Sequence, residues 1–222
     1  MGNPSLDTYS WFLGECSKSF KNVFLVPGNH EYYQSRGKSI LSIQHVNLLI
    51  ESICIKFTNV HFLNNKHYDL NEEYVIIGSP LWSYIPDSCQ GRAMYYNGDF
   101  YEIYIDGDKL VTPKYLNQLH EVNVKWLSDM IEKFKDKKII IATHYLPSMK
   151  LIDSCYLSNP LNHCFATDLE RLMVNNVYYW FAGHTHSSLT VQIGECLCVV
   201  NPKGYIDENS EYNDSLVIHL DK

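Results

Sequence analysis

Three apolar runs of strand length each lead directly into a loop that carries histidine. The runs and their loop histidines are residues 22–26 with His30, residues 138–142 with His144, and residues 178–182 with His184 and His186. In open α/β sheets, ligands bind beyond the carboxyl ends of the strands. The sequence therefore predicts an α/β protein whose chemistry lies at one edge of a sheet.

Helical patterns alternate with these strands. Apolar residues recur at steps of three and four across residues 6–20, 40–54 and 113–134. Thr112 before Pro113 is typical of a capped helix start. The remaining expected elements are strands at residues 60–63, 74–77, 189–193, 196–200 and 215–220, and a short helix at residues 168–174. Strands that alternate with helices favour a layered α/β fold.

The length of the chain is that of one domain. A chain of 222 residues with 45% hydrophobic content can bury a large core, so we expect a single domain over residues 1–222. Residues 83–112 are rich in Tyr, Gly and Asp and show no clear period. We interpret this stretch as a surface insertion that helps to shape a pocket.

The charge balance excludes some partners. Lys and Arg number 18 against 25 Asp and Glu, for a net charge of −7, which argues against a basic nucleic-acid-binding face. A small anionic substrate is still compatible, because bound metal ions supply local positive charge. No apolar run approaches the length of a membrane span, and the N-terminus lacks the pattern of a signal peptide. We expect neither nucleic acid nor membrane as a partner.

The seven cysteines are scattered and include no C-x-x-C pair. This pattern favours reduced thiols and a cytoplasmic protein over a disulfide framework. The one candidate group of zinc ligands consists of Cys155, His163 and Cys164, but their spacing fits no standard zinc pattern. We prefer to interpret them as structural residues.

The loop residues suit a transition metal. Imidazole rings together with the amide oxygen of Asn29 fit Mn, Fe or Zn better than calcium. A His-x-His pair in an extended loop directs its rings apart, so His184 and His186 suit two neighbouring metals better than one. Gly183 before the pair permits a close backbone approach or a positive φ.

These motifs occur in a fixed order along the chain. They are Gly28-Asn29-His30-Glu31, then His144, then Gly183-His184-Thr185-His186. The succession resembles the last three motifs of the calcineurin-like metallophosphoesterases, which are G-N-H-(D/E), a lone histidine and G-H-x-H. Further similar stretches lie at residues 78–83, 126–127, 168–170 and 201–205. The resemblance covers nearly the whole chain and implies an α-β-β-α sandwich of two mixed sheets flanked by helices.

The resemblance also implies an activity and a role for each motif residue. It implies hydrolysis of a phosphate mono- or diester by a metal-activated hydroxide held between two metal ions. The implied ligands are Asn29, His144 and His184 for one metal and His186 for the other. His30 is implied as the catalytic residue beside the leaving group, and Glu31 as a residue that orients the loop. No substrate-binding residue is assigned.

The sequence departs from the family pattern at its start. No D-x-H and no Gly-Asp precede Gly28, although these motifs supply the remaining metal ligands and the bridging carboxylate in the family. Gly2-Asn3-Pro4 is similar to the end of the G-D-x-x-(D/N) motif, so we expect an N-terminally truncated version of the fold that holds one metal. Two alternatives to a working enzyme follow: a catalytically impaired pseudoenzyme or metal-binding module, and a protein whose histidines are purely structural. The last requires several ordered motif matches to be coincidental.

Overall fold

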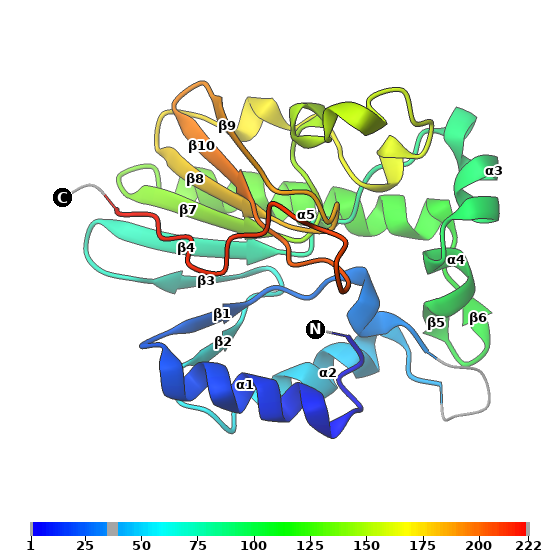
Figure 1. Ribbon diagram of the computed structural model, residues 1–222, viewed down its shortest axis with the longest axis horizontal. Coiled ribbons are helices and arrows are strands. Elements are labelled where there is room, and N and C mark those ends of the chain that lie inside the picture. Colours follow the sequence, from blue (N-terminus) through cyan, green and yellow to red (C-terminus); the bar gives the residue numbers. More distant parts are fainter. Residues whose placement is uncertain (1, 35–39, 221–222) are drawn as a thin grey trace.

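The molecule is layered, with helices outside two facing groups of strands (Figure 1). The computed structural model describes residues 2–34 and 40–220. The α-helices are α1 (Asp7–Ser19), α2 (Ile43–Cys54), α3 (Asp87–Tyr96), α4 (Asp99–Glu102) and α5 (Pro113–Lys133). Short 3-10 turns lie at Asn29–Tyr32, Met149–Leu151, Ser154–Tyr156, Asn162–Cys164 and Glu170–Leu172. α1 and α2 lie on one side of the strands, and α5 lies on the other (Figure 1).

The larger group of strands is a six-stranded mixed sheet. Its spatial order is β3 (Lys66–Asp69), β4 (Tyr74–Ser79), β7 (Lys138–Thr143), β8 (Val177–Ala182), β10 (Cys196–Val200) and β9 (Leu189–Ile193). The four central strands are parallel, and the two edge strands β3 and β9 run antiparallel to their neighbours. The smaller pairs are the parallel β1 (Val23–Leu25) and β2 (Val60–Phe62), and the antiparallel β5 (Tyr104–Asp106) and β6 (Lys109–Leu110). The predicted α/β fold, with a mixed sheet flanked by helices, is confirmed.

The core fills the spaces between these layers. The middle of β7 is apolar on both faces: Ile139 and Ile141 pack with Leu127 of α5, and Ile140 packs with Tyr179 on the opposite side of the sheet. A separate cluster joins α1 and α2 to the β1–β2 pair. Strands that are buried on both faces read as continuous apolar runs, which is why they can be located in the sequence.

The predicted elements are confirmed with two exceptions. α5 begins at Pro113 as predicted, and the Thr112 side chain accepts a hydrogen bond from the Tyr115 N–H. The helix predicted at residues 168–174 is wrong in extent, because only a 3-10 turn at Glu170–Leu172 forms there. The strand predicted at residues 215–220 is also wrong.

The C-terminal segment explains the second exception. Figure 1 shows it crossing the face of the six-stranded sheet instead of lying along an edge. Ile218 and Leu220 pack on that face, and the Tyr179 hydroxyl donates to the His219 carbonyl at 3.3 Å. The alternating apolar residues therefore cover the sheet without forming a backbone ladder.

Residues 83–112 fold into α3, α4 and the β5–β6 hairpin. The segment contributes fully buried apolar side chains to the cluster around α2, among them Ala93 and Ile103. It also contributes a buried carboxylate, Asp99. That residues 83–112 are an insertion stays a prediction. Their buried side chains pack in the same cluster as those of α1 and α2.

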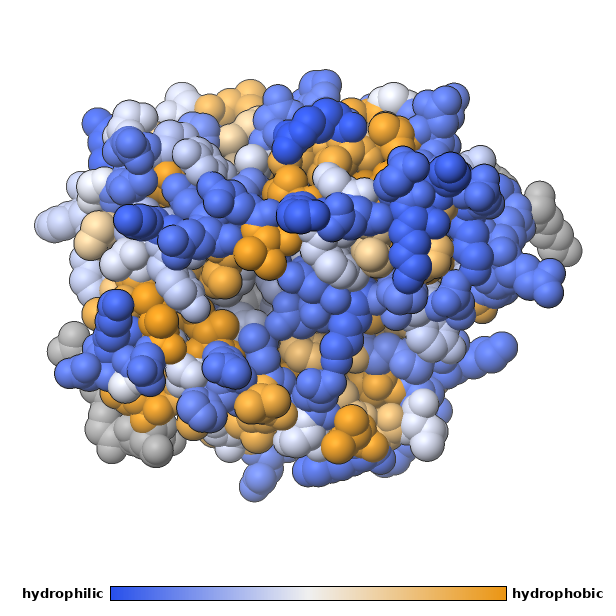
Figure 2. Space-filling model, turned by 180° about the vertical axis from the view of Figure 1, so that it is seen from behind, coloured by the Kyte–Doolittle hydropathy of each residue, from blue (hydrophilic) through white to orange (hydrophobic). Residues whose placement is uncertain are grey.

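The outer surface is mixed in character. Figure 2 shows one face on which hydrophilic residues predominate and apolar residues form separate patches. Across residues 2–34 and 40–220, no helix is both long enough and apolar enough to cross a membrane. All seven cysteines are unpaired, and Cys155 is exposed.

Candidate metal centre

The loop that follows β1 is closed by its own carboxylate. The Gly28 N–H donates to Glu31 Oε2 at 2.8 Å in a buried contact. This bond fixes the 3-10 turn that begins at Asn29. The expectation that Glu31 orients the loop is confirmed, and Asn29 is held buried at the end of the strand.

The parallel pairing of β7 and β8 brings two of the predicted histidines together. Ala142 is paired with Phe181 in the register of the two strands. His144 and Gly183 therefore leave the sheet side by side, and the Gly183 N–H donates to the His144 carbonyl at 3.0 Å. His184 follows at once.

Three side-chain atoms converge where these loops meet. His144 Nε2 lies 3.0 Å from Asn29 Oδ1 and 3.1 Å from His184 Nδ1. His144 Nε2 carries at most one proton, so it can donate to only one of these neighbours, and without that proton it faces the Asn29 oxygen with a lone pair. A cation shared by the three lone pairs would satisfy all of them. The donor set of two imidazoles and one amide oxygen fits Mn, Fe or Zn.

A glycine makes room for this arrangement. A Cβ placed on Gly28 would lie 2.5–2.8 Å from three atoms of the His144 ring. Because real Cβ contacts are essentially never this short, any side chain at position 28 would have to displace the ring. Gly28 thus serves close approach, since its φ of −104° is available to any residue.

Burial keeps both rings of this group neutral. Desolvation, reinforced by the neighbouring His184, holds the pKa of His144 well below its usual range. Desolvation also lowers the pKa of His184 to about 4, although the nearby Asp99 carboxylate opposes this shift. Neutral imidazole is the form that binds a metal ion. Both rings therefore present lone pairs at neutral pH.

His186 is directed to a different neighbourhood. His184 and His186 both adopt left-handed backbone conformations, with φ of 69° and 54°, which non-glycine residues rarely do. His186 Nδ1 lies 2.7 Å from Glu208 Oε2, and its ring packs edge-on against Tyr205. No described hydrogen bond or ring contact joins it to the Asn29–His144–His184 group. The two histidines therefore have different described neighbours.

Glu208 holds His186 in one orientation. The Tyr205 amide, with help from His186, lowers the pKa of Glu208, so its carboxylate is ionised and accepts the Nδ1 proton. Whenever this ring is neutral, its lone pair is on Nε2, the atom available to a cation.

His30 lies between two tyrosine rings. It stacks on Tyr33 with ring centroids 4.4 Å apart, and its Nε2 lies 3.3 Å from the Tyr205 hydroxyl. Partial burial lowers the pKa of His30. These contacts fix the ring of the predicted catalytic residue.

Sequence reasoning missed several residues of this centre. Asp99 accepts hydrogen bonds from Asn29 and Tyr33 in the buried part of the site. Two residues that follow β10 also belong to the centre. Glu208 contacts His186, and Tyr205 contacts His30. The resemblance at residues 201–205 includes Tyr205 without assigning it a role, and no spacing points to Asp99 or Glu208.

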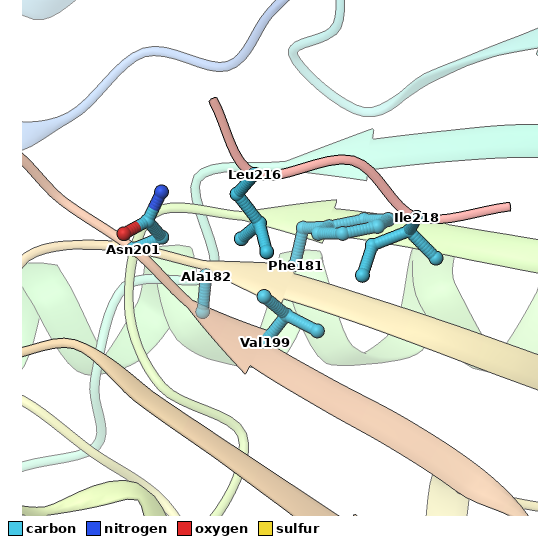
Figure 3. Close-up of a pocket in the computed structure, with 6 residues that line it drawn as sticks. All are labelled: Phe181, Ala182, Val199, Asn201, Leu216 and Ile218. Atoms are coloured by element: carbon cyan, nitrogen blue, oxygen red, sulfur yellow. The ribbon is translucent and has the colours of Figure 1, made fainter. Parts of the chain in front are cut away.

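The centre is separate from the cavity at the C-terminal segment, and it relies on a ligand other than His, Cys, Asp and Glu. In the part of the chain that the structure describes, no three His, Cys, Asp or Glu side chains form a metal-holding group, so the candidate centre depends on the Asn29 amide. A cavity of about 440 Å³ lies under the C-terminal segment, where Leu216 and Ile218 point toward Phe181 (Figure 3). None of the candidate metal ligands lines it.

Comparisons with known proteins show the family of the chain. The family model for calcineurin-like phosphoesterases matches residues 2–188. An uncharacterised protein, L509 of Acanthamoeba polyphaga mimivirus, is 29% identical over 232 aligned residues that cover 100% of this chain and 82% of L509.

Two solved structures share the fold. Phosphopantetheinyl hydrolase (PptH) from Mycobacterium tuberculosis superposes with a TM-score of 0.68 at 16% identity, covering 91% of this chain and 76% of PptH. TT1561 of Thermus thermophilus gives a TM-score of 0.51 at 14% identity, covering 88% of this chain and 68% of TT1561. Identities this low show a common fold alone, whereas the family model spans most of the sequence. The chain belongs to the calcineurin-like phosphoesterase family.

Proposed function

We propose that this protein is a metal-dependent phosphoesterase that hydrolyses a phosphate mono- or diester. The observation that carries the proposal is the convergence of Asn29 Oδ1, His144 Nε2 and His184 Nδ1 beyond the carboxyl ends of parallel strands. Family membership supports a phosphoesterase type of chemistry. The three side chains would hold one divalent ion of Mn, Fe or Zn.

The metal and the chain would have separate tasks. A bound divalent cation supplies positive charge that polarises a phosphoryl oxygen and makes water more acidic. His30 would donate a hydrogen bond to the leaving-group oxygen from the ring that Tyr33 and Tyr205 hold in place. His186 would offer Nε2 only to a second, weakly held ion, because no other described candidate ligand contacts it.

A weakly active metal-binding protein is the second candidate. Its support is specific: one group of three candidate ligand atoms converges, whereas His186 has Glu208 as its described hydrogen-bond partner and no described contact with that group. We therefore propose one tightly bound ion for this chain, a phosphoester substrate, and a cytoplasmic location.

The proposal predicts both a stoichiometry and a rate. After loading with Mn²⁺ or Zn²⁺ and removal of free ion, elemental analysis is expected to give about one metal per chain. Hydrolysis of an aryl phosphate is expected to be weak but metal-dependent. His144→Ala is expected to lose both properties, because it removes the atom that contacts the other two ligands.

An exposed histidine on β3 provides the control. His67→Ala removes an imidazole that has no contact with the centre and should retain metal and activity. Two metal equivalents with robust hydrolysis would contradict the single-ion proposal. A wild-type chain that retains no metal would contradict the proposed ligands themselves.

A further inference from the structure

A buried carboxylate lies directly behind the candidate metal ligands. Asp99, at the start of α4, is 1% exposed. Its Oδ1 accepts hydrogen bonds from Asn29 Nδ2 at 2.8 Å and from the Tyr33 hydroxyl at 2.7 Å. Its Oδ2 accepts from the Tyr145 hydroxyl and from Asn97 Nδ2, each at 3.3 Å. Burying a carboxylate is costly unless it is fully hydrogen-bonded, and these donors meet that requirement.

The contact with Asn29 determines which end of the amide faces the histidines. An ionised carboxylate only accepts hydrogen bonds, so it can face the NH₂ end of the amide but not the carbonyl end. With Nδ2 bound to Asp99, Oδ1 is directed to His144 Nε2 at 3.0 Å. An amide turned the other way would set its Nδ2 against the metal-binding position and its oxygen against the carboxylate.

The carboxylate also connects the loops that carry the ligands. Tyr33 follows the turn of Asn29, and Tyr145 follows His144 in sequence. Their hydroxyls both donate to Asp99, so one residue of α4 ties the loop after β1 to the loop after β7. The direct ligand set of Asn29, His144 and His184 is neutral, and Asp99 places a negative charge in hydrogen-bond contact with it. A nearby anion stabilises a bound cation.

We infer that Asp99 is a positioning residue for the metal centre: it fixes the Asn29 amide with its oxygen toward the ion and supplies the buried negative charge behind it. The inference rests on the proposed function, because it requires that the Asn29 group binds a metal. Partners that orient metal ligands in this way typically contribute about 10- to 100-fold in metal affinity.

The test compares Co²⁺ binding by the wild-type chain and by Asp99→Asn. The variant keeps the size of the side chain but removes the charge and allows an NH₂ group to face Asn29. We expect Co²⁺ affinity, measured by competition with a chromophoric chelator, to fall about 10- to 100-fold. The visible absorption bands of bound Co²⁺, which report ligand geometry, should shift as well. The thermal midpoint of the metal-free protein is measured in parallel.

A double variant reverses the polarity of the pair. In Asn29→Asp with Asp99→Asn, the carboxylate becomes the ligand and the amide becomes its donor, at unchanged total charge. We expect this exchange to recover most of the lost affinity. If Asp99→Asn alone does not fold, the double variant still tests whether Asp99 positions Asn29, because it restores a matched buried pair. A folded double variant that does not bind Co²⁺ would contradict the inference.

Asn117→Ala is the matched control for a purely structural effect. Asn117 is also buried, and it bonds the backbone of Ile85 without touching a ligand. This change should lower the thermal midpoint and leave Co²⁺ affinity unchanged. If Asp99→Asn binds Co²⁺ as tightly as wild type, the positioning role is wrong while the proposed function stands. A wild-type chain that takes up no Co²⁺ overturns the proposed function, and this inference with it.

Discussion

Gly28→Ala is expected to produce a folded protein that has lost its metal site. The added Cβ would lie 2.5–2.8 Å from the buried His144 ring, so the ring must move to make room. Such a shift separates Nε2 from Asn29 Oδ1 and His184 Nδ1, which lie only 3.0 and 3.1 Å away. Displacements of about 1 Å cost about 100-fold in activity at other sites, and we expect a loss of this order in metal-dependent hydrolysis and in metal affinity.

The same substitution elsewhere separates this effect from a general cost of alanine. Gly91 lies in α3, and a Cβ there would meet nothing within 4 Å. Gly91→Ala should therefore stabilise the helix by about 0.5 to 1 kcal/mol and leave metal binding unchanged. Isothermal titration with Mn²⁺ compares the two variants. Wild-type affinity in Gly28→Ala would show that His144 does not occupy the position that the metal requires.

Trp180→Ala is expected to cause a large loss of stability. Trp180 lies in the centre of β8 with 0% exposure, and its Nε1–H donates to Thr143 Oγ1 at 3.0 Å. Truncating a buried tryptophan leaves a large cavity and costs about 3 to 5 kcal/mol. Since whole domains are stable by only about 5 to 15 kcal/mol, urea unfolding at neutral pH should show a greatly lowered midpoint.

An exposed tryptophan is available for comparison. Trp11 on α1 is 66% exposed, so Trp11→Ala should change the free energy of unfolding by no more than about 0.5 kcal/mol. Equal losses in the two variants would mean that β8 does not lie at the centre of the sheet. That result would also remove the basis for placing His184 beside His144.

The strand ends and their histidines were predictable because local patterns encode them. Residues 138–142 and 178–182 are continuous apolar runs, which is what a strand buried on both faces requires. The loops after them carry the motif residues, and parallel pairing places those loops at one edge. The meeting of His144 and His184 therefore follows from short stretches of sequence together with one topological rule. Asn29 follows β1, which pairs with β2 in a separate sheet, so the expectation that all three strands end at the edge of one sheet is wrong.

The rest of the centre depends on contacts between distant segments. Asp99 meets Asn29 across 70 residues, and Glu208 meets His186 across 22. Neither carboxylate lies in a periodic run or beside a motif, so no local pattern marks them. The strand predicted at residues 215–220 failed for a related reason. Alternating apolar residues indicate one apolar face, but they do not show whether the backbone pairs with a neighbouring strand.

The central claim is that Asn29, His144 and His184 together hold a transition metal. Anomalous diffraction from crystals grown with Mn²⁺ or Zn²⁺ tests it directly, because the signal at the absorption edge locates the ion. The account predicts a peak within ligand distance of Asn29 Oδ1, His144 Nε2 and His184 Nδ1. Ordered side chains with no peak between them, or a metal bound only elsewhere in the molecule, would contradict it.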